Sequence, residues 1–240
     1  EFRTEVGTVG GLHRRLAHWV ARLQPAGPVR VLDAGCGTGG FLKSAAALGR
    51  GWPLTGVDLS PLAVALARER SGAEVRESSI TALPFAAASF DAVVTGDVLY
   101  HVGDVALALR EFARCVKPGG AVFVNEPAYR WLWSYHDEAV ESKHRFTRPE
   151  LVALFRQAGL EVVFASYANF LILPLIVARR KIFPPKQPGS DVQLSAAPVE
   201  AGLAFLAWLE FGWMKCGLPL PAGSTVFVAG VKPATGAPGR

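Results

Sequence analysis

A ten-residue segment constrains the fold of this chain more than any other feature. Residues 31–40 read VLDAGCGTGG, so an apolar stretch runs directly into closely spaced glycines. This order predicts a buried strand, a tight turn that needs glycine's conformational freedom, and the start of a helix. Gly35, Gly37 and Gly40 also satisfy the pattern G-x-G-x-x-G, which is typical of nucleotide-binding turns but does not identify the nucleotide.

Strand and helix patterns alternate along most of the chain, which predicts a doubly wound, mostly parallel α/β sheet. A helix is expected to begin at Ser60-Pro61, because serine caps free amides and proline suits the first turn. The remaining predicted helices are 10–23, 41–48, 105–115 and 149–158, and the predicted strands are 29–33, 54–58, 75–78, 90–95, 121–125, 160–166 and 224–231.

Polar residues follow these strands in a recognisable order. Asp58 ends the second strand, Ser79-Ile80 follows the third, Asp97 closes the fourth, and Lys117-Pro118-Gly119-Gly120 precedes the fifth. With the glycine turn, residues 29–125 resemble the class I methyltransferases that depend on S-adenosylmethionine (SAM). The resemblance implies SAM as the cofactor and a seven-stranded sheet whose last strand is antiparallel, with helical lid insertions added here.

The resemblance also implies a role for each matching position. The turn from Gly35 to Gly39 would hold the methionine portion of SAM, with Asp33 beneath it. Asp58 would bind the ribose, and Asp97 would reach the methionine amino group. Many relatives have Asp where this chain has Ser79, a neutral and weaker partner for the adenine. The expected cofactor-binding residues are Asp33, Gly35, Cys36, Gly37, Gly39, Asp58, Leu59, Ser79, Ile80 and Asp97. Leu59 and Ile80 are alternatively core residues, and Cys36 is expected to fill the loop and not to act as a nucleophile.

The chain is expected to divide around this core. Residues 1–28 would form an N-terminal helical cap, and 29–169 the SAM-binding core, which includes a lid at 126–147. An apolar insertion at 170–223, interrupted by a polar linker at 184–198, precedes the final strand at 224–233 and a tail at 234–240. If the last strand is antiparallel, both the lid and the insertion leave the carboxyl edge of the sheet and cover the site.

The lid combines aromatic, histidine and charged residues. It resembles a bacterial methyltransferase subgroup with a Trp-Leu-Trp-Ser-x-His-Asp segment, but Ser142 and His144 depart from that pattern. An aromatic wall suits an apolar or cationic substrate, although Trp131 and Trp133 could instead be hydrophobic anchors. The candidate substrate-binding residues are Tyr100, Glu126, Tyr129, Trp131, Trp133 and His144.

The expected reaction is the in-line transfer of a methyl group to a small, partly hydrophobic metabolite such as a natural-product or lipid-like intermediate. A base is needed only if the acceptor carries a proton, and imidazole titrates near neutral pH. We therefore take His101 and His136 as the candidate catalytic residues, while His101 could also simply stabilise its loop. The scattered histidines indicate no metal site.

The sequence leaves several functions open. A nucleic-acid methyltransferase is disfavoured, because residues 97–100 read DVLY and not the Asn/Asp-Pro-Pro-aromatic motif of amino-methylating DNA enzymes. A non-catalytic SAM-binding protein is also compatible with these motifs, whereas the motifs after the second strand oppose a nicotinamide dehydrogenase. Three widely spaced cysteines indicate a reducing cytoplasm. The insertion could also contact a membrane surface, with Arg179, Arg180, Lys181 and Lys186 facing lipid head groups.

Overall fold

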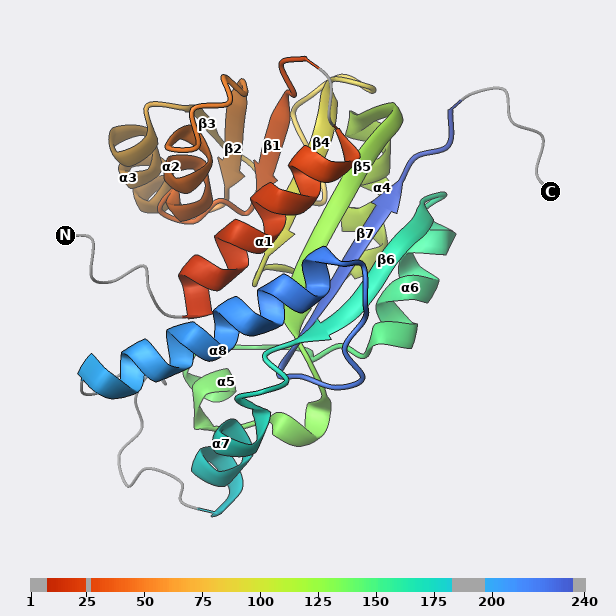
Figure 1. The fold of residues 1–240 in the computed structure, drawn as a ribbon. Coiled ribbons are helices and arrows are strands. Elements are labelled where there is room, and N and C mark those ends of the chain that lie inside the picture. Colours follow the sequence, from red (N-terminus) through yellow and green to blue (C-terminus); the bar gives the residue numbers. More distant parts are fainter. Residues whose placement is uncertain (1–7, 25–26, 183–196, 235–240) are drawn as a thin grey trace.

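A seven-stranded sheet with helices on both faces forms the body of the protein (Figure 1). The computed structural model describes residues 8–24, 27–182 and 197–234. Lys186, almost all of the expected linker at 184–198 and nearly all of the expected tail at 234–240 lie outside these ranges. No described helix is long and apolar enough to cross a membrane.

The order of the strands confirms the predicted fold class. Across the sheet the order is β3-β2-β1-β4-β5-β7-β6. Strands β1 to β5 pair in parallel, and β7 is antiparallel to both of its neighbours. The bounds are β1 Val31–Ala34, β2 Leu54–Asp58, β3 Glu74–Glu77, β4 Phe90–Gly96, β5 Val116–Pro127, β6 Glu161–Ala168 and β7 Thr225–Val231.

Strand β5 corrects one sequence-based boundary. The sequence predicts a strand at 121–125 that follows Pro118-Gly119-Gly120, but β5 already begins at Val116. The reason is a partner far along the chain: the amide of Gly119 donates to the carbonyl of Lys232, and the amide of Lys232 donates to the carbonyl of Gly120. The pairing with β4 shifts register between Phe90 and Ala92, which accommodates the extra residues.

The helices follow the predicted alternation and add short ones in the insertions. Helix α3 is capped as expected, with the Ser60 hydroxyl accepting from the amide of Ala63. The α-helices are α1 Thr8–Leu23, α2 Gly40–Ala46, α3 Pro61–Ser71, α4 Val105–Cys115, α5 Tyr135–Ala139, α6 Arg148–Gln157, α7 Leu173–Val177 and α8 Ala197–Lys215, with the short turns η2 Leu99–His101, η3 Arg130–Leu132 and η4 Ala178–Ile182.

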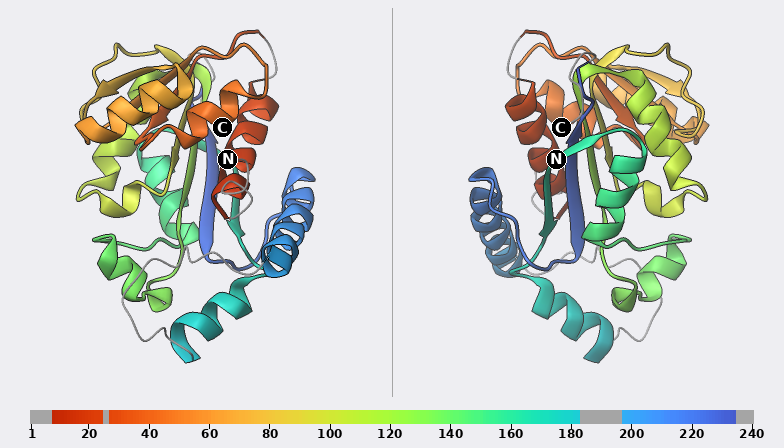
Figure 2. Two further views of the ribbon diagram at one scale, coloured as in Figure 1. Left: turned by 90° about the vertical axis from the view of Figure 1, so that its left-hand side faces the viewer. Right: turned by 90° about the vertical axis from the view of Figure 1, so that its right-hand side faces the viewer.

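Two apolar layers hold the helices on the sheet. Figure 2 shows α1 and α8 on one face and α4 and α6 on the other. Trp19 of α1 stacks on Phe164 at 4.3 Å between ring centroids, while Phe112 of α4 and Phe155 of α6 are fully buried on the opposite face. Because both faces are covered, the central strands carry apolar side chains in either direction.

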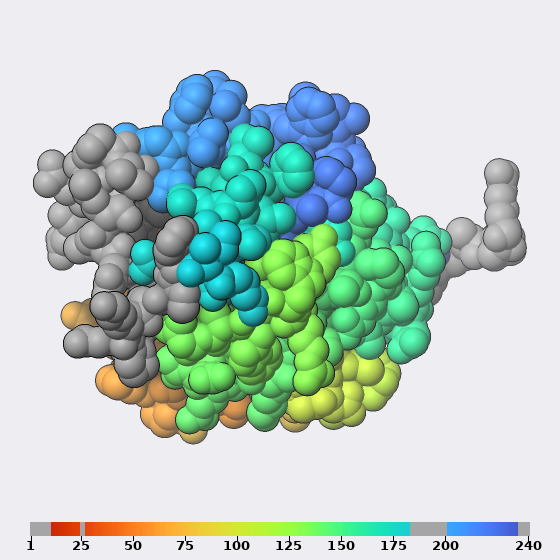
Figure 3. Space-filling view, turned by 90° about the horizontal axis from the view of Figure 1, so that it is seen from below, coloured from red at the N-terminus to blue at the C-terminus, as the bar shows by residue number. Residues whose placement is uncertain are grey.

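The carboxyl edge of the sheet is covered by two segments that are distant in sequence. Viewed onto this edge, residues 126–147 and the segment at 170–182 lie side by side across it (Figure 3). The contact is direct, because Arg180 donates to the carbonyl of Leu132 and Lys181 to that of Trp133. These elements therefore occupy the place that the topology argument predicted for a cover.

The second half of the insertion lies elsewhere. Helix α8 runs beside α1 along the sheet face, where Met214 is fully buried and Phe211 contacts the ring of His18. Of the insertion's described residues, those around α7 and η4 cover the edge. Glu210 connects the two parts, because its carboxylate accepts the amides of Asn169, Phe170 and Leu171.

The outer face of α8 leaves large apolar side chains in contact with solvent. Phe205, Trp208, Leu209 and Trp213 are 43–59% exposed and recur at helical spacing. Packing against the core thus explains why the inner face of α8 is apolar, but it does not explain these four exposed apolar side chains. Contact with a membrane surface stays a prediction for these side chains.

Candidate functional site

The glycine turn after β1 has a geometry that only glycine tolerates at two positions. Gly35 has φ of 82°, and a Cβ there would lie 2.5 Å from both Cγ atoms of Val98. Gly39 has φ of 81°, and its Cβ would come within 2.9 Å of the Cα of Ala67. Positive φ and close approach together exclude larger side chains. The turn therefore lies directly against the loop that follows β4.

Asp58 connects this turn to the end of β2. Its half-buried carboxylate accepts the amide of Gly37 at 2.8 Å through Oδ2 and the amide of Ser60 at 2.9 Å through Oδ1. Two backbone donors thus hold the carboxylate that is predicted to bind the ribose. Leu59, beside it, is 69% exposed, so the core alternative for Leu59 does not apply.

Asp33 is a buried carboxylate with an unused oxygen. The residue is 5% exposed, and its Oδ2 has no hydrogen-bond partner among the described residues. Burial, together with the nearby charge of Asp58, raises the pKa of Asp33 to about 8. An unpaired carboxylate in the interior is costly, and a donor or cation from a ligand would relieve the cost.

Arg15 is a site residue that the sequence interpretation missed. It lies on α1, is 6% exposed, and donates from Nη2 to the Asn125 side chain of β5 at 3.2 Å. Its Nε has no partner in the described part of the chain. A signal was present, because Arg15 falls between Leu12 and Trp19 on the apolar face of the helix, where a charged residue is unexpected.

Helix α1, which carries Arg15, packs against the end of β4 and the start of α2. The side chain of Leu12 lies against Gly96 at the end of β4, and the ring of His13 lies against Gly40 at the start of α2. The glycine turn, Asp33 and Arg15 therefore combine a close-approach surface with an unpaired carboxylate oxygen and an unpaired guanidinium N–H. Such a set fits a ligand that carries both an ammonium and a carboxylate, as the methionine portion of SAM does.

Three more of the predicted cofactor residues have contacts within the protein. The Ser79 hydroxyl lies 2.7 Å from that of Thr81 and accepts the amide of Thr81. Ile80 is 6% exposed and belongs to the apolar core, so its contact with adenine stays a prediction. Cys36 is buried against Gly56, and burial raises the pKa of its thiol, which fits a filling role.

The loop after β4 is held by a single buried carboxylate. Glu126, with no exposed surface, accepts the amides of Val98 and Leu99 through Oε1 and that of Tyr100 through Oε2, at 2.9–3.1 Å. Burial and the charge of Asp97 raise the pKa of Glu126 to about 8, against the effect of the three amides. The sequence placed Glu126 among the substrate contacts, whereas its carboxylate is occupied by the loop.

Asp97 begins this loop in a strained conformation. Its φ is 57°, and its amide donates to the carbonyl of Asn125 at 2.8 Å. The residue as a whole is exposed, but its carboxylate lies among buried groups. Burial raises the pKa of Asp97 to about 6, against the effect of the charges of Arg15 and Arg145. A positive φ in a residue other than glycine is frequent at functional turns.

A buried ion pair closes the lid. Arg145 donates from Nε and Nη2 to the two oxygens of Asp137 at 2.6 and 3.0 Å, and from Nη1 to the carbonyl of Ala128. Both side chains are at most 3% exposed. Although burial disfavours its charge, the guanidinium holds the pKa of Asp137 below its usual value. This two-pronged geometry fixes the lid segments 128–137 and 143–147 against each other.

The lid is also joined to the loop after β4. The amides of Lys143 and His144 both donate to the carbonyl of Tyr100, at 2.8 and 3.3 Å. Burial raises the pKa of the Tyr100 hydroxyl to about 12, so this group stays protonated at neutral pH. A protonated hydroxyl can donate a hydrogen bond but cannot act as a base.

The candidate histidines lie in different surroundings. His101 is exposed, with its ring centroid 4.0 Å from that of Tyr100. Nδ1 of His136, on α5, is buried without a hydrogen-bond partner in the described structure. His144 is held by Glu150, with 2.7 Å between Nε2 and Oε1. Of these three, His101 combines exposure with a position directly after β4.

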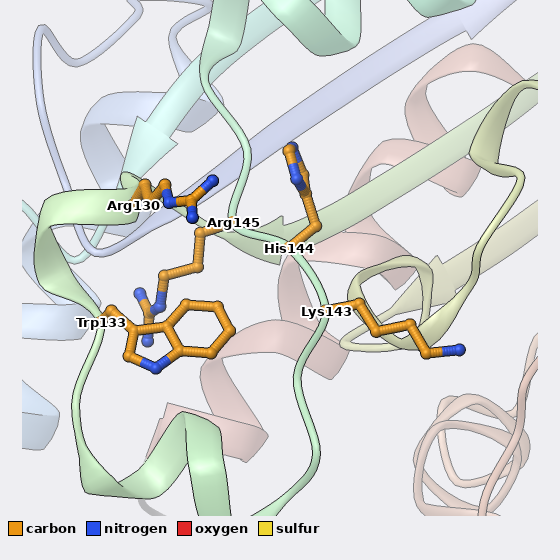
Figure 4. Close-up of a pocket in the computed structure, with 5 residues that line it drawn as sticks. All are labelled: Arg130, Trp133, Lys143, His144 and Arg145. Atoms are coloured by element: carbon orange, nitrogen blue, oxygen red, sulfur yellow. The ribbon is translucent and has the colours of Figure 1, made fainter.

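The aromatic residues of the lid divide between two places. Tyr129 stacks on Trp131 and on Tyr167, and Trp131 is 53% exposed. Trp133 instead lines a pocket with Arg130, Lys143, His144 and Arg145 (Figure 4). Leu132 and Phe146 are the large, fully buried apolar side chains of the lid, and Trp133 is only half-buried. Across residues 8–24, 27–182 and 197–234, no three His, Cys, Asp or Glu side chains gather as metal ligands.

Comparisons with known proteins agree with this arrangement. A family described as "Methyltransferase domain" matches residues 32–124. The ubiquinone biosynthesis O-methyltransferase of Pseudomonas putida (strain W619) is 38% identical over 164 residues, which cover 60% of this chain and 70% of that protein. The chain is a class I SAM-dependent methyltransferase.

Solved methyltransferases share the fold of this enzyme. A geranyl diphosphate methyltransferase in complex with SAM superposes with a TM-score of 0.62 and 20% identity, covering 90% of this chain and 84% of that one. A geranyl diphosphate C-methyltransferase from Streptomyces coelicolor A3(2) gives 0.60 and 18% identity, covering 90% and 77%. At this identity the likeness concerns the methyltransferase fold alone.

Proposed function

We propose that this methyltransferase transfers the methyl group of SAM to a small, partly hydrophobic metabolite. The observation that carries the proposal is the closed lid: the buried Asp137–Arg145 pair and the contacts of Lys143 and His144 with Tyr100 cover the carboxyl edge. A closed cover favours a small acceptor over a polymer. The relatives named ubiquinone biosynthesis O-methyltransferases support an oxygen acceptor on a small molecule.

The residues around the glycine turn would hold SAM. Asp58 would accept the ribose hydroxyls, the turn from Gly35 to Gly39 would lie along the methionine portion, and Asp33 and Asp97 would face its ammonium. Arg15 would pair with its carboxylate. Leu59, Ser79 and Ile80 would border the adenine.

The chain's own contribution to the reaction is mostly orientation. When bound, SAM supplies a methyl group that its sulfonium already activates for displacement. Holding the acceptor in line with that methyl group is worth up to about 7–11 kcal/mol of the barrier. For an acceptor hydroxyl, His101 would take the proton as the new oxygen–carbon bond forms, and the Tyr100 hydroxyl would donate a hydrogen bond to the acceptor. His136 is the second candidate base.

The acceptor class is tested by following the methyl group. The enzyme is incubated with methyl-labelled SAM and a cell extract, and the products are separated into solvent-extractable and nucleic-acid fractions. Label in the solvent fraction is expected. The control is Gly35→Ala, whose added Cβ would clash with Val98. Label in nucleic acid would overturn the proposal, and SAM binding without any transfer would favour a non-catalytic SAM-binding protein.

Calorimetry with NAD tests the dehydrogenase alternative, which would be favoured by binding of NAD without binding of SAM.

SAM affinity is expected to depend on pH through Asp33. Its pKa near 8 in the free protein means that the carboxyl is mostly protonated at pH 6. A cationic ligand beside it favours the ionised form, so affinity rises as pH increases toward 8. Between pH 5.5 and 7.0 we expect a gain of about tenfold, measured by calorimetry. Asp33→Asn should bind SAM with a clearly smaller rise, which comes from Asp97, whose pKa burial raises to about 6. An equal slope in both proteins would exclude Asp33 as a titrating group.

A further inference from the structure

The lid contains a pocket with a strongly basic lining. Arg130, Trp133, Lys143, His144 and Arg145 enclose about 220 Å³. In Figure 4 these side chains come from two facing segments, and the guanidinium of Arg130 turns toward the segment 143–145 while Lys143 extends away from Trp133. None of the proposed cofactor-binding residues lines this pocket, so the pocket is separate from the proposed SAM site.

The charges of this pocket are not balanced by its neighbours. Asp137 already pairs with Arg145 and lies 4.0 Å from the guanidinium of Arg180, and Glu150 faces His144. The side chains of Arg130 and Lys143 have no hydrogen-bond or ion-pair partner in the described part of the chain. Lys181 adds another positive charge, because its ammonium donates to the carbonyl of Trp133. The pocket thus presents an excess of positive charge.

The pocket lies next to the loop that carries Asp97. The amides of Lys143 and His144 donate to the carbonyl of Tyr100, and Glu126 holds the Tyr100 amide. A group bound between Arg130 and Arg145 would therefore be fixed relative to this loop. Arg130 supplies planar, paired N–H donors that match carboxylate and phosphate oxygens, and Trp133 supplies an apolar face beside them.

We infer that the pocket between Arg130, Trp133 and residues 143–145 binds the acidic group, a carboxylate or a phosphate, of the methyl acceptor. Trp133 would pack against the ring or apolar carbon skeleton attached to that group. The inference rests on the proposed function and narrows it to small acceptors that carry a negative charge. Arg130 would anchor the anion, and the exposed Lys143, which extends away from Trp133, would add positive charge near the pocket without contacting the anion.

Direct binding measurements test this inference without a known acceptor. Calorimetry at constant ionic strength uses inorganic pyrophosphate as the phosphate probe, and benzoate with its uncharged counterpart benzamide as the carboxylate probe. Pyrophosphate and benzoate are expected to bind, and benzamide to bind at least tenfold more weakly than benzoate. Arg130→Gln should lower both anion affinities about tenfold and Lys143→Gln about threefold. Trp133→Leu should weaken benzoate and leave pyrophosphate unchanged.

Controls separate this inference from the proposed function. Arg110→Gln removes an exposed charge on α4, away from the lid, and should change no affinity. SAM affinity of all variants should stay within twofold of the original protein, and circular dichroism should confirm their fold. Equal binding of benzoate and benzamide, or unchanged pyrophosphate affinity in the Arg130→Gln Lys143→Gln protein, would overturn the inference. The inference is also contradicted if the Arg130→Gln Lys143→Gln protein binds anionic vesicles or RNA more weakly but binds pyrophosphate and benzoate as the original protein does.

Discussion

Replacing Asp58 with alanine is expected to weaken SAM binding by about 100-fold. A carboxylate that accepts two ribose hydroxyls contributes about 3 kcal/mol, because hydrogen bonds to charged groups are each worth about 1.5–3 kcal/mol. The variant also removes the acceptor for the amides of Gly37 and Ser60. The glycine turn stays bonded to β2, because the amides of Gly35 and Cys36 still donate to the carbonyl of Val57. Calorimetric titration with SAM and with S-adenosylhomocysteine measures the loss.

The control for Asp58 is an aspartate with similar contacts at the opposite end of the sheet. Asp91 opens β4, accepts the amide of Arg30 at 2.9 Å and pairs with Lys117 at 2.7 Å. Asp91→Ala should cost stability and leave SAM affinity within twofold. A ligand without the ribose hydroxyls should bind the original protein and Asp58→Ala with nearly equal affinity. If Asp58→Ala keeps its affinity for SAM, the carboxylate has no ribose role.

Replacing Glu126 with alanine is expected to affect both stability and activity. Three backbone amides, those of residues 98–100, would lose their acceptor in an interior position. Each unsatisfied buried donor costs about 1–3 kcal/mol, so we expect the free energy of unfolding to fall by about 3 kcal/mol or more. Since the same loop carries Asp97, Tyr100 and His101, kcat should fall at least tenfold. Denaturant unfolding and kinetics on the identified acceptor check the two effects.

Two further variants distinguish the position of the loop from general destabilisation. Glu126→Gln keeps one oxygen for Val98 and Leu99 but places an N–H donor near the amide of Tyr100, so intermediate losses are expected. Glu111→Ala removes a carboxylate that accepts the amide of Leu83 and pairs with Arg114 on α4. It should lower stability with unchanged kcat. A Glu126→Ala protein that is destabilised but fully active below its unfolding temperature would remove Glu126 from the positioning of this loop.

The parts of the site that sequence could predict are those encoded locally or by topology. The turn after β1 needs glycines because Gly35 and Gly39 have positive φ and close neighbours, and this requirement is visible as closely spaced glycines. Asp58 was predictable because parallel strands end at one edge of the sheet, so a polar residue at the end of β2 faces the turn after β1. The same rule predicts that residues 126–147 lie over that edge.

The parts that sequence could not supply are contacts between distant segments. Arg15 bonds to Asn125 across 110 residues, and helix α8 packs beside α1 and does not cover the edge as expected of the insertion. The sequence interpretation places Glu126 among the candidate substrate contacts. Its three amide partners, 26–28 residues away, give the carboxylate a different use.

The sequence of this protein by itself determined the alternation of strands and helices, the glycine turn and the acidic residue that ends β2. Each of these depends on backbone conformation or on the direction of parallel strands. Only the tertiary structure decided which buried charges are paired and which are not. Burial makes an unpaired charge costly, so the partners of Asp33, Arg15, Glu126 and Arg145 are set by which segments meet in space. The excess positive charge at Arg130 and Lys143 is likewise a property of two facing segments and of neither alone.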